Sequence, residues 1–259
     1  MTATVAVPAA IRRLDTFGLP LDACPDLETA AAAFRRKLAS GENFLVTFMN
    51  PGCVALSRKT TRFARAVARF DMVLPDGIGL SKAAEALHGV PAARISFDST
   101  SLALEVFGEA QRRGSRVLLV GGAPGVAERA AARIRESYPH LRIVGALDGY
   151  GSRQETVARI AALAPDIVVC GMGAVAQEDM LLALSEAGWR GCGFTCGGYL
   201  DQLSGGLHYY PGWVDRLNLR WAYRLAREPR RLGRRYLADY PQFVLAFARQ
   251  AAGWAPKPA

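Results

Sequence analysis

The sequence lacks several features that would place it in a specialised class of protein. It has no run of about 18 uncharged apolar residues, so we expect no transmembrane helix and only peripheral contact with a membrane. Residues 1–10 carry no basic residue before their apolar stretch, and we expect no signal peptide. The five cysteines are an odd number, which argues against a disulfide framework and favours reduced thiols in the cytoplasm.

Patterns typical of metal sites are also missing. Cys192 and Cys196 are not followed by a second Cys or His pair at ligand spacing, and the three histidines are isolated. There is no Asp-x-Asp, although a divalent metal that bridges a diphosphate usually needs clustered carboxylates. We therefore expect no metal. Chemistry at a phosphate would then depend on backbone N–H groups and arginines.

Positive charge is plentiful and is concentrated in one region. The net charge is +9, and between Arg216 and Arg249 nine arginines are opposed only by Glu228 and Asp239. Residues 216–249 thus carry a net charge of +7. Such an excess indicates an anionic partner, which is a nucleic acid, a membrane surface or a phosphorylated substrate.

Apolar runs alternate with helical patterns along most of the chain. This alternation predicts right-handed βαβ units, an α/β class with a Rossmann-like, mostly parallel sheet flanked by helices. The strands are apolar throughout, which fits a sheet covered on both faces. Predicted strands cover residues 44–49, 72–74, 116–120, 141–146, 166–170 and 193–196. Predicted helices cover residues 53–69, 99–113 with Ser99 as N-cap, the stretch from the glycine turn to 138, 155–163 and 176–187.

From about residue 212 the pattern becomes helical and rich in arginine. We therefore predict an α/β catalytic domain over 1–211 and a helical basic appendage over 212–259. An arginine stripe in the appendage lies beside an apolar stripe that includes Trp221, and Pro229 should end or kink this helix. Basic amphipathic helices suit an anionic lipid interface. Binding of nucleic acid or of substrate phosphates, or simple packing on the catalytic domain, are the alternatives.

In open parallel sheets, ligands bind beyond the carboxyl ends of the strands. Asp76 follows an apolar strand directly and is a candidate general base for a sugar hydroxyl, with a turn-capping aspartate as the alternative. The turn that starts at Gly121 and Gly122 is either a phosphate cradle or an ordinary strand–helix turn. Further candidates are Thr47 and Asn50 at one strand end, Gly77 beside Asp76, Arg94 and Asp98 after Pro91, and the cluster Gly171, Gly173, Gln177 and Glu178.

These pieces, in this order, resemble the WecG/TagA/CpsF family of bacterial glycosyltransferases (glycosyltransferase family 26), from about residue 17 to 247. The string from Trp221 to Tyr236 is the most specific match. The other matches are Pro75-Asp76-Gly77-Ile78-Gly79, Val120-Gly121-Gly122, Pro139 to Tyr150, and Gly171-Met172-Gly173 with Gln177-Glu178.

The resemblance implies an inverting, metal-independent transfer from a UDP-sugar to a saccharide on polyprenyl diphosphate, in cell-surface polysaccharide biosynthesis at the inner face of the cell membrane. No cofactor is implied. The family's catalytic aspartate matches Asp76, and its pocket asparagine, pocket arginine and conserved glutamine match Asn50, Arg94 and Gln177. The arginines implied to contact the acceptor or the membrane are Arg220, Arg224, Arg227, Arg230, Arg231, Arg234 and Arg235.

The sequence departs from the family at several positions. Many members carry Thr where this chain has Phe48, with Thr47 one residue away, and the string from Gly173 to Glu178 lacks the usual Pro and Lys. An N-acetylmannosamine-type donor and a hexosyl donor such as glucosyl are both open, as are the acceptor, the linkage and a homo-oligomeric state.

Two other functions are weighed against this one. A Rossmann-type oxidoreductase is disfavoured by the incomplete glycine fingerprint and by the lack of a well-placed ribose-binding acid. A non-enzymatic nucleic-acid or membrane module would bind DNA or RNA in a strongly salt-dependent way. We expect no nucleic acid among the partners.

Overall fold

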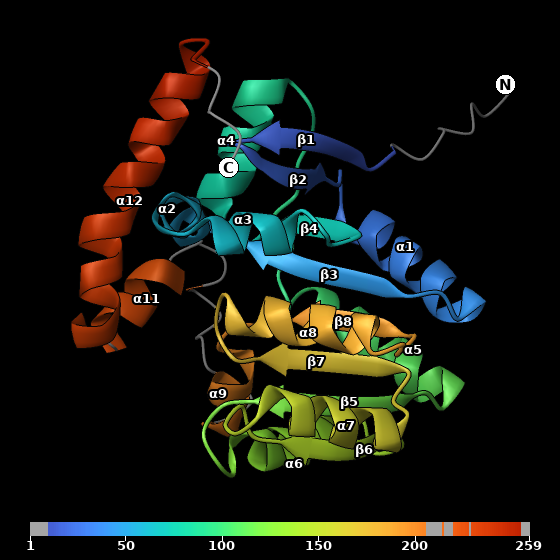
Figure 1. The fold of residues 1–259 in the computed structure, drawn as a ribbon. Coiled ribbons are helices and arrows are strands. Elements are labelled where there is room, and N and C mark those ends of the chain that lie inside the picture. The colour runs from blue at the N-terminus through green and yellow to red at the C-terminus, as the bar shows by residue number, and fades with distance from the viewer. Residues whose placement is uncertain (1–9, 206–213, 215–219, 228, 255–259) are drawn as a thin grey trace, which may run out of the picture.

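The computed structural model describes residues 10–205, 214, 220–227 and 229–254, with only part of the side chains between 220 and 236. Its centre is a six-stranded parallel sheet of order β4-β3-β8-β7-β5-β6 (Figure 1), which confirms the predicted α/β fold. The strands of this sheet are β3 (Phe44–Met49), β4 (Met72–Pro75), β5 (Arg116–Gly121), β6 (Arg142–Leu147), β7 (Ile167–Gly171) and β8 (Cys192–Thr195), and a separate two-stranded sheet is formed by β1 (Arg12–Thr16) and β2 (Leu19–Ala23).

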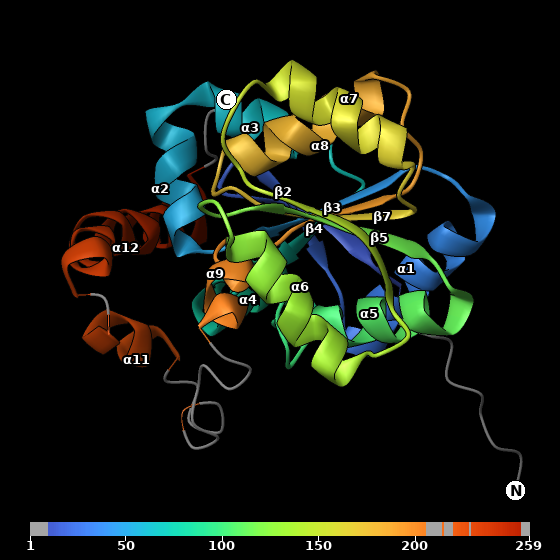
Figure 2. The same cartoon turned by 90° about the horizontal axis from the view of Figure 1, so that it is seen from below.

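Helices cover both faces of this sheet. Figure 2 shows α2, α3, α7 and α8 on one face and α1, α5 and α6 on the other. Along β3, Phe44, Val46 and Phe48 pack into one apolar core while Leu45 and Met49 pack into the second, which confirms the predicted two-sided burial. The helices are α1 (Leu27–Ser40), α2 (Pro51–Lys59), α3 (Thr61–Val67), α4 (Ile78–His88), α5 (Leu102–Arg113), α6 (Val126–Ser137), α7 (Arg153–Leu163), α8 (Ala176–Glu186), α9 (Tyr199–Ser204), α11 (Arg220–Arg227) and α12 (Pro229–Ala251).

Two predicted helix boundaries are wrong. The single helix expected over 53–69 is two helices, because Thr60 is extended and its hydroxyl caps α3 by accepting from the N–H of Arg62. The helix expected from Ser99 begins at Leu102, with Ser101 at the N-cap position. Ser99 instead forms a hydrogen bond of 2.8 Å between its hydroxyl and that of Tyr199.

An antiparallel hairpin, β1–β2, precedes the sheet and was not predicted. Its two-residue turn has positive φ at Phe17 (63°) and Gly18 (77°), the geometry of a type I′ turn. The hairpin is joined to the sheet edge through Asp22, which accepts from the N–H of Val73 on β4 (2.6 Å) and from the guanidinium of Arg13. In the sequence, each strand of this hairpin is only five residues long and mixes apolar with charged side chains.

Helix α12 packs along α2 and forms part of the wall of the α/β body (Figure 1). The Phe243 ring is buried 5.5 Å from that of Phe17, and Lys59 pairs with Asp239 at 2.7 Å. Gln250 accepts from the N–H of Phe17. The start of α12 at Pro229 confirms the predicted helix break, whereas the predicted boundary at 211/212 lies outside the described residues. None of the described helices is both long and apolar enough to span a membrane.

Candidate active site

A cleft of about 1120 Å³ opens at the carboxyl ends of the parallel strands. Its walls come from the loops after β3, β4, β5, β7 and β8 and from Tyr240, Phe243 and Val244 of α12. Except for Thr47 and Gly121, every candidate site residue predicted in the α/β body lines this one cleft. Those that line it are Asn50, Asp76, Gly77, Arg94, Asp98, Gly122, Gly171, Gly173, Gln177 and Glu178.

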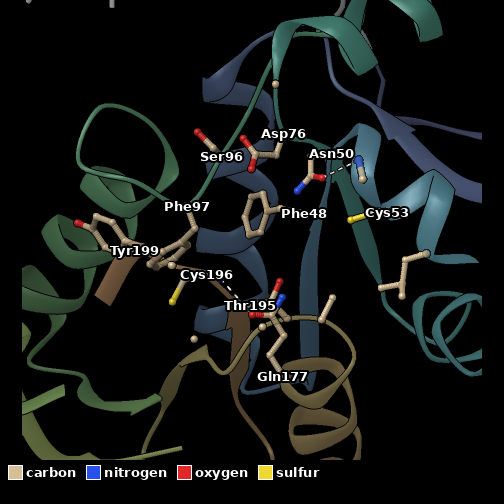
Figure 3. A pocket seen from close by; sticks show the side chains of 18 of the residues that line it. Phe48, Asn50, Cys53, Asp76, Ser96, Phe97, Gln177, Thr195, Cys196 and Tyr199 are labelled. Carbon is tan, nitrogen blue, oxygen red and sulfur yellow. Dashed lines mark hydrogen bonds between the residues drawn. The ribbon is translucent and has the colours of Figure 1, made fainter. Parts of the chain in front are cut away.

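Asp76 and Asn50 stand at the ends of neighbouring strands. The register pairs Met49 with Pro75, and the N–H of Asp76 donates to the carbonyl of Met49 at 2.6 Å. Asn50 caps α2, since its Oδ1 accepts from the N–H of Gly52 at 3.0 Å. Figure 3 shows the two side chains together at one side of the cleft. A carboxylate held in this way beside an amide can accept a proton from a ligand hydroxyl.

Arg94 and Asp98 belong to one hydrogen-bonded group with Ser96. Arg94 Nη2 donates to Ser96 Oγ at 2.6 Å and to Asp98 Oδ2 at 3.1 Å, and Ser96 Oγ donates to the same Asp98 oxygen. The segment follows the sheet edge, because the N–H of Ile95 donates to the carbonyl of Pro75. A cation is thereby held in a fixed place at the cleft. Ser96 was not predicted, and its only signal is its place midway between the two charged residues.

The glycine turn after β5 is shaped by close packing. A Cβ at Gly121, where φ is 138°, would lie 2.1 Å from the carbonyl oxygen of Gly171. The N–H of Gly122 donates to that same oxygen at 3.1 Å, and the carbonyl of Gly122 accepts from Gly149. The Gly122 amide is therefore already used, and phosphate binding by this turn stays a prediction.

A buried polar network lies beneath the cleft, between β3, β8 and α8. Thr47 is 1% exposed and donates its hydroxyl to Glu178 Oε1 at 3.1 Å, while Gln177 Nε2 donates to the same oxygen at 3.0 Å. Gln177 Oε1 accepts from the N–H of Gly197, and Thr47 is hydrogen-bonded to Thr195. This network sets the orientation of the Gln177 amide. Contact of Thr47 with substrate stays a prediction, since Thr47 does not line the cleft.

Glu178 is 1% exposed, and its second oxygen, Oε2, has no hydrogen-bond partner among the described residues. Burial raises the pKa of this carboxyl above its ordinary value, although hydrogen bonds from Gln177 and Thr47 lower it in part. A carboxyl whose pKa is raised by folding stabilises the fold when it is protonated. That contribution is present below the ordinary pKa and is lost as the pH rises through the folded-state pKa.

We therefore expect Glu178→Gln to be stabilising relative to wild type at alkaline pH and close to neutral at pH 4. The amide has the shape of the protonated acid and carries no charge that burial would disfavour. Thermal unfolding of both proteins from pH 4 to pH 9 measures this difference, with Glu186→Gln, an exposed glutamate at the end of α8, as the control. A difference in Tm that does not change with pH would mean that Glu178 is ionised in the fold throughout.

Two further predictions, metal independence and the role of the appendage arginines, are not tested by the structure. Among the described residues no group of three or more His, Cys, Asp or Glu could hold a metal ion, and metal independence stays a prediction. The described cysteines form no disulfide. The side chains of the seven predicted appendage arginines lie outside the described residues, although the backbones of α11 and α12 that carry them are described.

An open parallel sheet with a cleft of this kind at its carboxyl end is the architecture of enzymes that bind nucleotides. The chain belongs to the WecG/TagA/CpsF family of glycosyl transferases, whose model matches residues 14–256, and it is therefore a glycosyltransferase. Membership of this family argues against the two alternative functions, a Rossmann-type oxidoreductase and a non-enzymatic nucleic-acid or membrane module.

Curated relatives support this assignment. The chain is 30% identical to the UDP-Gal:alpha-D-GlcNAc-diphosphoundecaprenol beta-1,4-galactosyltransferase of Shigella boydii over 78% of this chain and 85% of the relative. It is 28% identical to the N-acetylglucosaminyldiphosphoundecaprenol N-acetyl-beta-D-mannosaminyltransferase of Bacillus subtilis, over 80% of this chain and 79% of the relative. The enzyme of the same name in Bacillus spizizenii is 29% identical over 78% of this chain and 77% of the relative.

Proposed function

We propose that this protein transfers a sugar from a UDP-sugar to a saccharide linked to polyprenyl diphosphate, with inversion and without a metal. The observation that carries the proposal is the position of Asp76 at a strand end, where its N–H donates to the carbonyl of Met49 and the residue lines a cleft of about 1120 Å³. The relatives support the substrates, since their names specify acceptors on undecaprenyl diphosphate and beta-configured transfer. UDP-hexoses ordinarily carry the sugar in α linkage, so a β product means inversion.

In the proposed reaction a hydroxyl oxygen of the acceptor sugar attacks the anomeric carbon of the donor. Asp76 takes the hydroxyl proton as the new C–O bond forms, because a neutral hydroxyl is a weak nucleophile. The bond between the anomeric carbon and the phosphate oxygen breaks, and UDP leaves with that electron pair. Arg94, fixed by Ser96 and Asp98 at the cleft, is the candidate cation for stabilising the charge that develops on the leaving group.

The acceptor should enter from the side of α12. Leu237, Val244 and Leu245 of α12 are 82%, 60% and 47% exposed, and Ile78 at the start of α4 is 38% exposed. Val244 and Ile78 also line the cleft, so an exposed apolar surface of α12 borders the cleft on the same helix as the arginine cluster, which consists of Arg230, Arg231, Arg234 and Arg235. Such a surface supports peripheral docking on the inner face of the cell membrane.

Calorimetric titration with nucleotides tests the donor half of the proposal. UDP and a UDP-hexose are expected to bind the purified protein in the presence of EDTA, and NAD(H) is expected not to bind. Binding of NAD(H) without any binding of UDP or of UDP-hexoses would overturn it. If UDP binds without EDTA but not in its presence, the proposed metal independence is wrong, whereas the proposed transfer reaction is not contradicted.

A further inference from the structure

Three aromatic rings form the floor of the cleft between its polar strand ends. They are Phe48 on β3, Phe97 in the segment before α5, and Tyr199 at the start of α9, and all three line the cleft. The centroid of the Phe97 ring lies 6.1 Å from that of Phe48 and 5.8 Å from that of Tyr199, in edge-to-face arrangements. Figure 3 shows this row of rings between the polar groups of the cleft.

The floor is held rigidly from below. Phe48, Phe97 and Tyr199 are 9%, 4% and 6% exposed, so most of each ring is packed in the core and only a small part faces the cleft. Behind them, the Phe97 ring packs edge-to-face on Phe107, with the centroids 5.9 Å apart, and at a tilt on Phe194, with the centroids 5.3 Å apart. A ligand that binds on such a surface does not have to order it first.

Phe48 lies next to the candidate base. Strands β3 and β4 pair Phe48 with Leu74 and Met49 with Pro75, so Asp76 follows two residues after the partner of Phe48. In the view of Figure 3 the Phe48 ring is drawn below the Asp76 side chain, with the Asn50 side chain to its right. The register therefore places Phe48 and Asp76 on neighbouring strands, where one sugar can contact both.

The chemistry of a pyranose fits this pairing of groups. Its hydroxyls lie around the edge of the ring, while one face presents several C–H groups that stack on an aromatic ring. Here an aromatic ring and a proton-accepting carboxylate are neighbours. We propose that the part of the Phe48 ring that faces the cleft, backed by Phe97, is the apolar platform that contacts the C–H face of the acceptor sugar's pyranose ring. This inference rests on the proposed function, because the sugar that gives up its proton to Asp76 is the acceptor.

Steady-state kinetics of Phe48→Leu and Phe48→Met test the platform. Both variants keep an apolar side chain of similar volume and lose the ring, so the fold should survive. We expect the KM for the lipid-linked acceptor to rise about tenfold and the KM for the UDP-sugar to stay within about twofold of wild type. Phe63→Leu is the matched control, because Phe63 is a buried ring of α3 that does not line the cleft, and its substitution should leave both KM values unchanged.

Each result decides the proposal. A rise in the acceptor KM in whichever variant folds, without a change in the donor KM, supports it. An unchanged acceptor KM overturns it, and a rise confined to the donor KM also overturns it, because the ring then serves the donor sugar. A wild-type protein that transfers sugar to no lipid-linked acceptor would instead refute the proposed function, and this result is distinct from a failure of the platform.

Discussion

Replacing Asp76 with asparagine is expected to lower kcat for sugar transfer by about 10²- to 10⁴-fold, the range typical of the loss of a general base. Asparagine keeps the size of the side chain but cannot accept the proton of the acceptor hydroxyl. The backbone bond from Asp76 to Met49 does not depend on the carboxylate, so folding should persist. Initial rates of UDP release, with donor and acceptor at saturation, measure the effect. Thermal unfolding checks that the variant is folded.

Asp201→Asn is a matched control for this experiment. Asp201 is an exposed carboxylate of α9 that lines the same cleft but does not follow a strand of the sheet. We expect its replacement to change kcat by less than about threefold. A folded Asp76→Asn protein with nearly wild-type kcat would show that the base is another group. A large loss in Asp201→Asn alone would identify that group.

Substitution of the arginine cluster at the start of α12 is expected to remove binding to anionic vesicles. The cluster consists of Arg230, Arg231, Arg234 and Arg235. Each basic residue near an anionic membrane contributes about 1 kcal/mol, so changing all four to glutamine should weaken binding by roughly 10³-fold. Sedimentation with phosphatidylglycerol vesicles at low salt measures this loss. Transfer to an acceptor embedded in those vesicles should fall in parallel.

Substitution is preferable to deletion of residues 212–259, because α12 contributes Phe243 and Ala246 to the core and a truncation would expose Phe17. Transfer to a short-chain acceptor in solution separates the two roles that the arginines can have. If the cluster only docks the protein, this transfer survives; if it also holds the acceptor diphosphate, this transfer falls too. Undiminished vesicle binding would show that the cluster does not contact the membrane. The control changes four exposed arginines elsewhere, namely Arg36, Arg65, Arg129 and Arg135.

The parallel sheet was predictable because each strand is a short apolar run with its own boundary signals. The predicted strand over 44–49 coincides with β3, which Asn50 and Pro51 terminate. The break at Thr60 was missed, although residues 57–62 carry no apolar side chain and threonine is a residue type that caps helices. The β1–β2 hairpin was missed because neither strand is an apolar run: β1 contains two arginines and an aspartate, and β2 contains a proline and an aspartate.

From the sequence, only those site residues that directly follow a strand could be placed at the same edge of the sheet. Asp76 and Asn50 follow apolar strands, so their presence at one edge of the sheet follows from the topology. The hydrogen bond from Thr47 to Glu178 joins residues 131 positions apart, and no local pattern indicates it. The role of α12 was also hidden, because its arginines indicate a partner while its buried Phe243 shows that it is part of the wall of the cleft.

Acceptor-dependent transfer tests most directly whether this protein moves a sugar from a UDP-sugar to a saccharide on polyprenyl diphosphate. The purified protein would be incubated with a panel of UDP-hexoses and UDP-N-acetylhexosamines, with and without a polyprenyl-diphosphate-linked sugar, and the lipid fraction analysed by mass spectrometry. For at least one donor we expect a lipid product that is heavier by one sugar residue and that forms in the presence of EDTA, and we expect the Asp76→Asn variant not to form it. Absence of a glycosylated lipid with every donor, from a folded protein and with several lipid-linked acceptors, would contradict the proposed transfer.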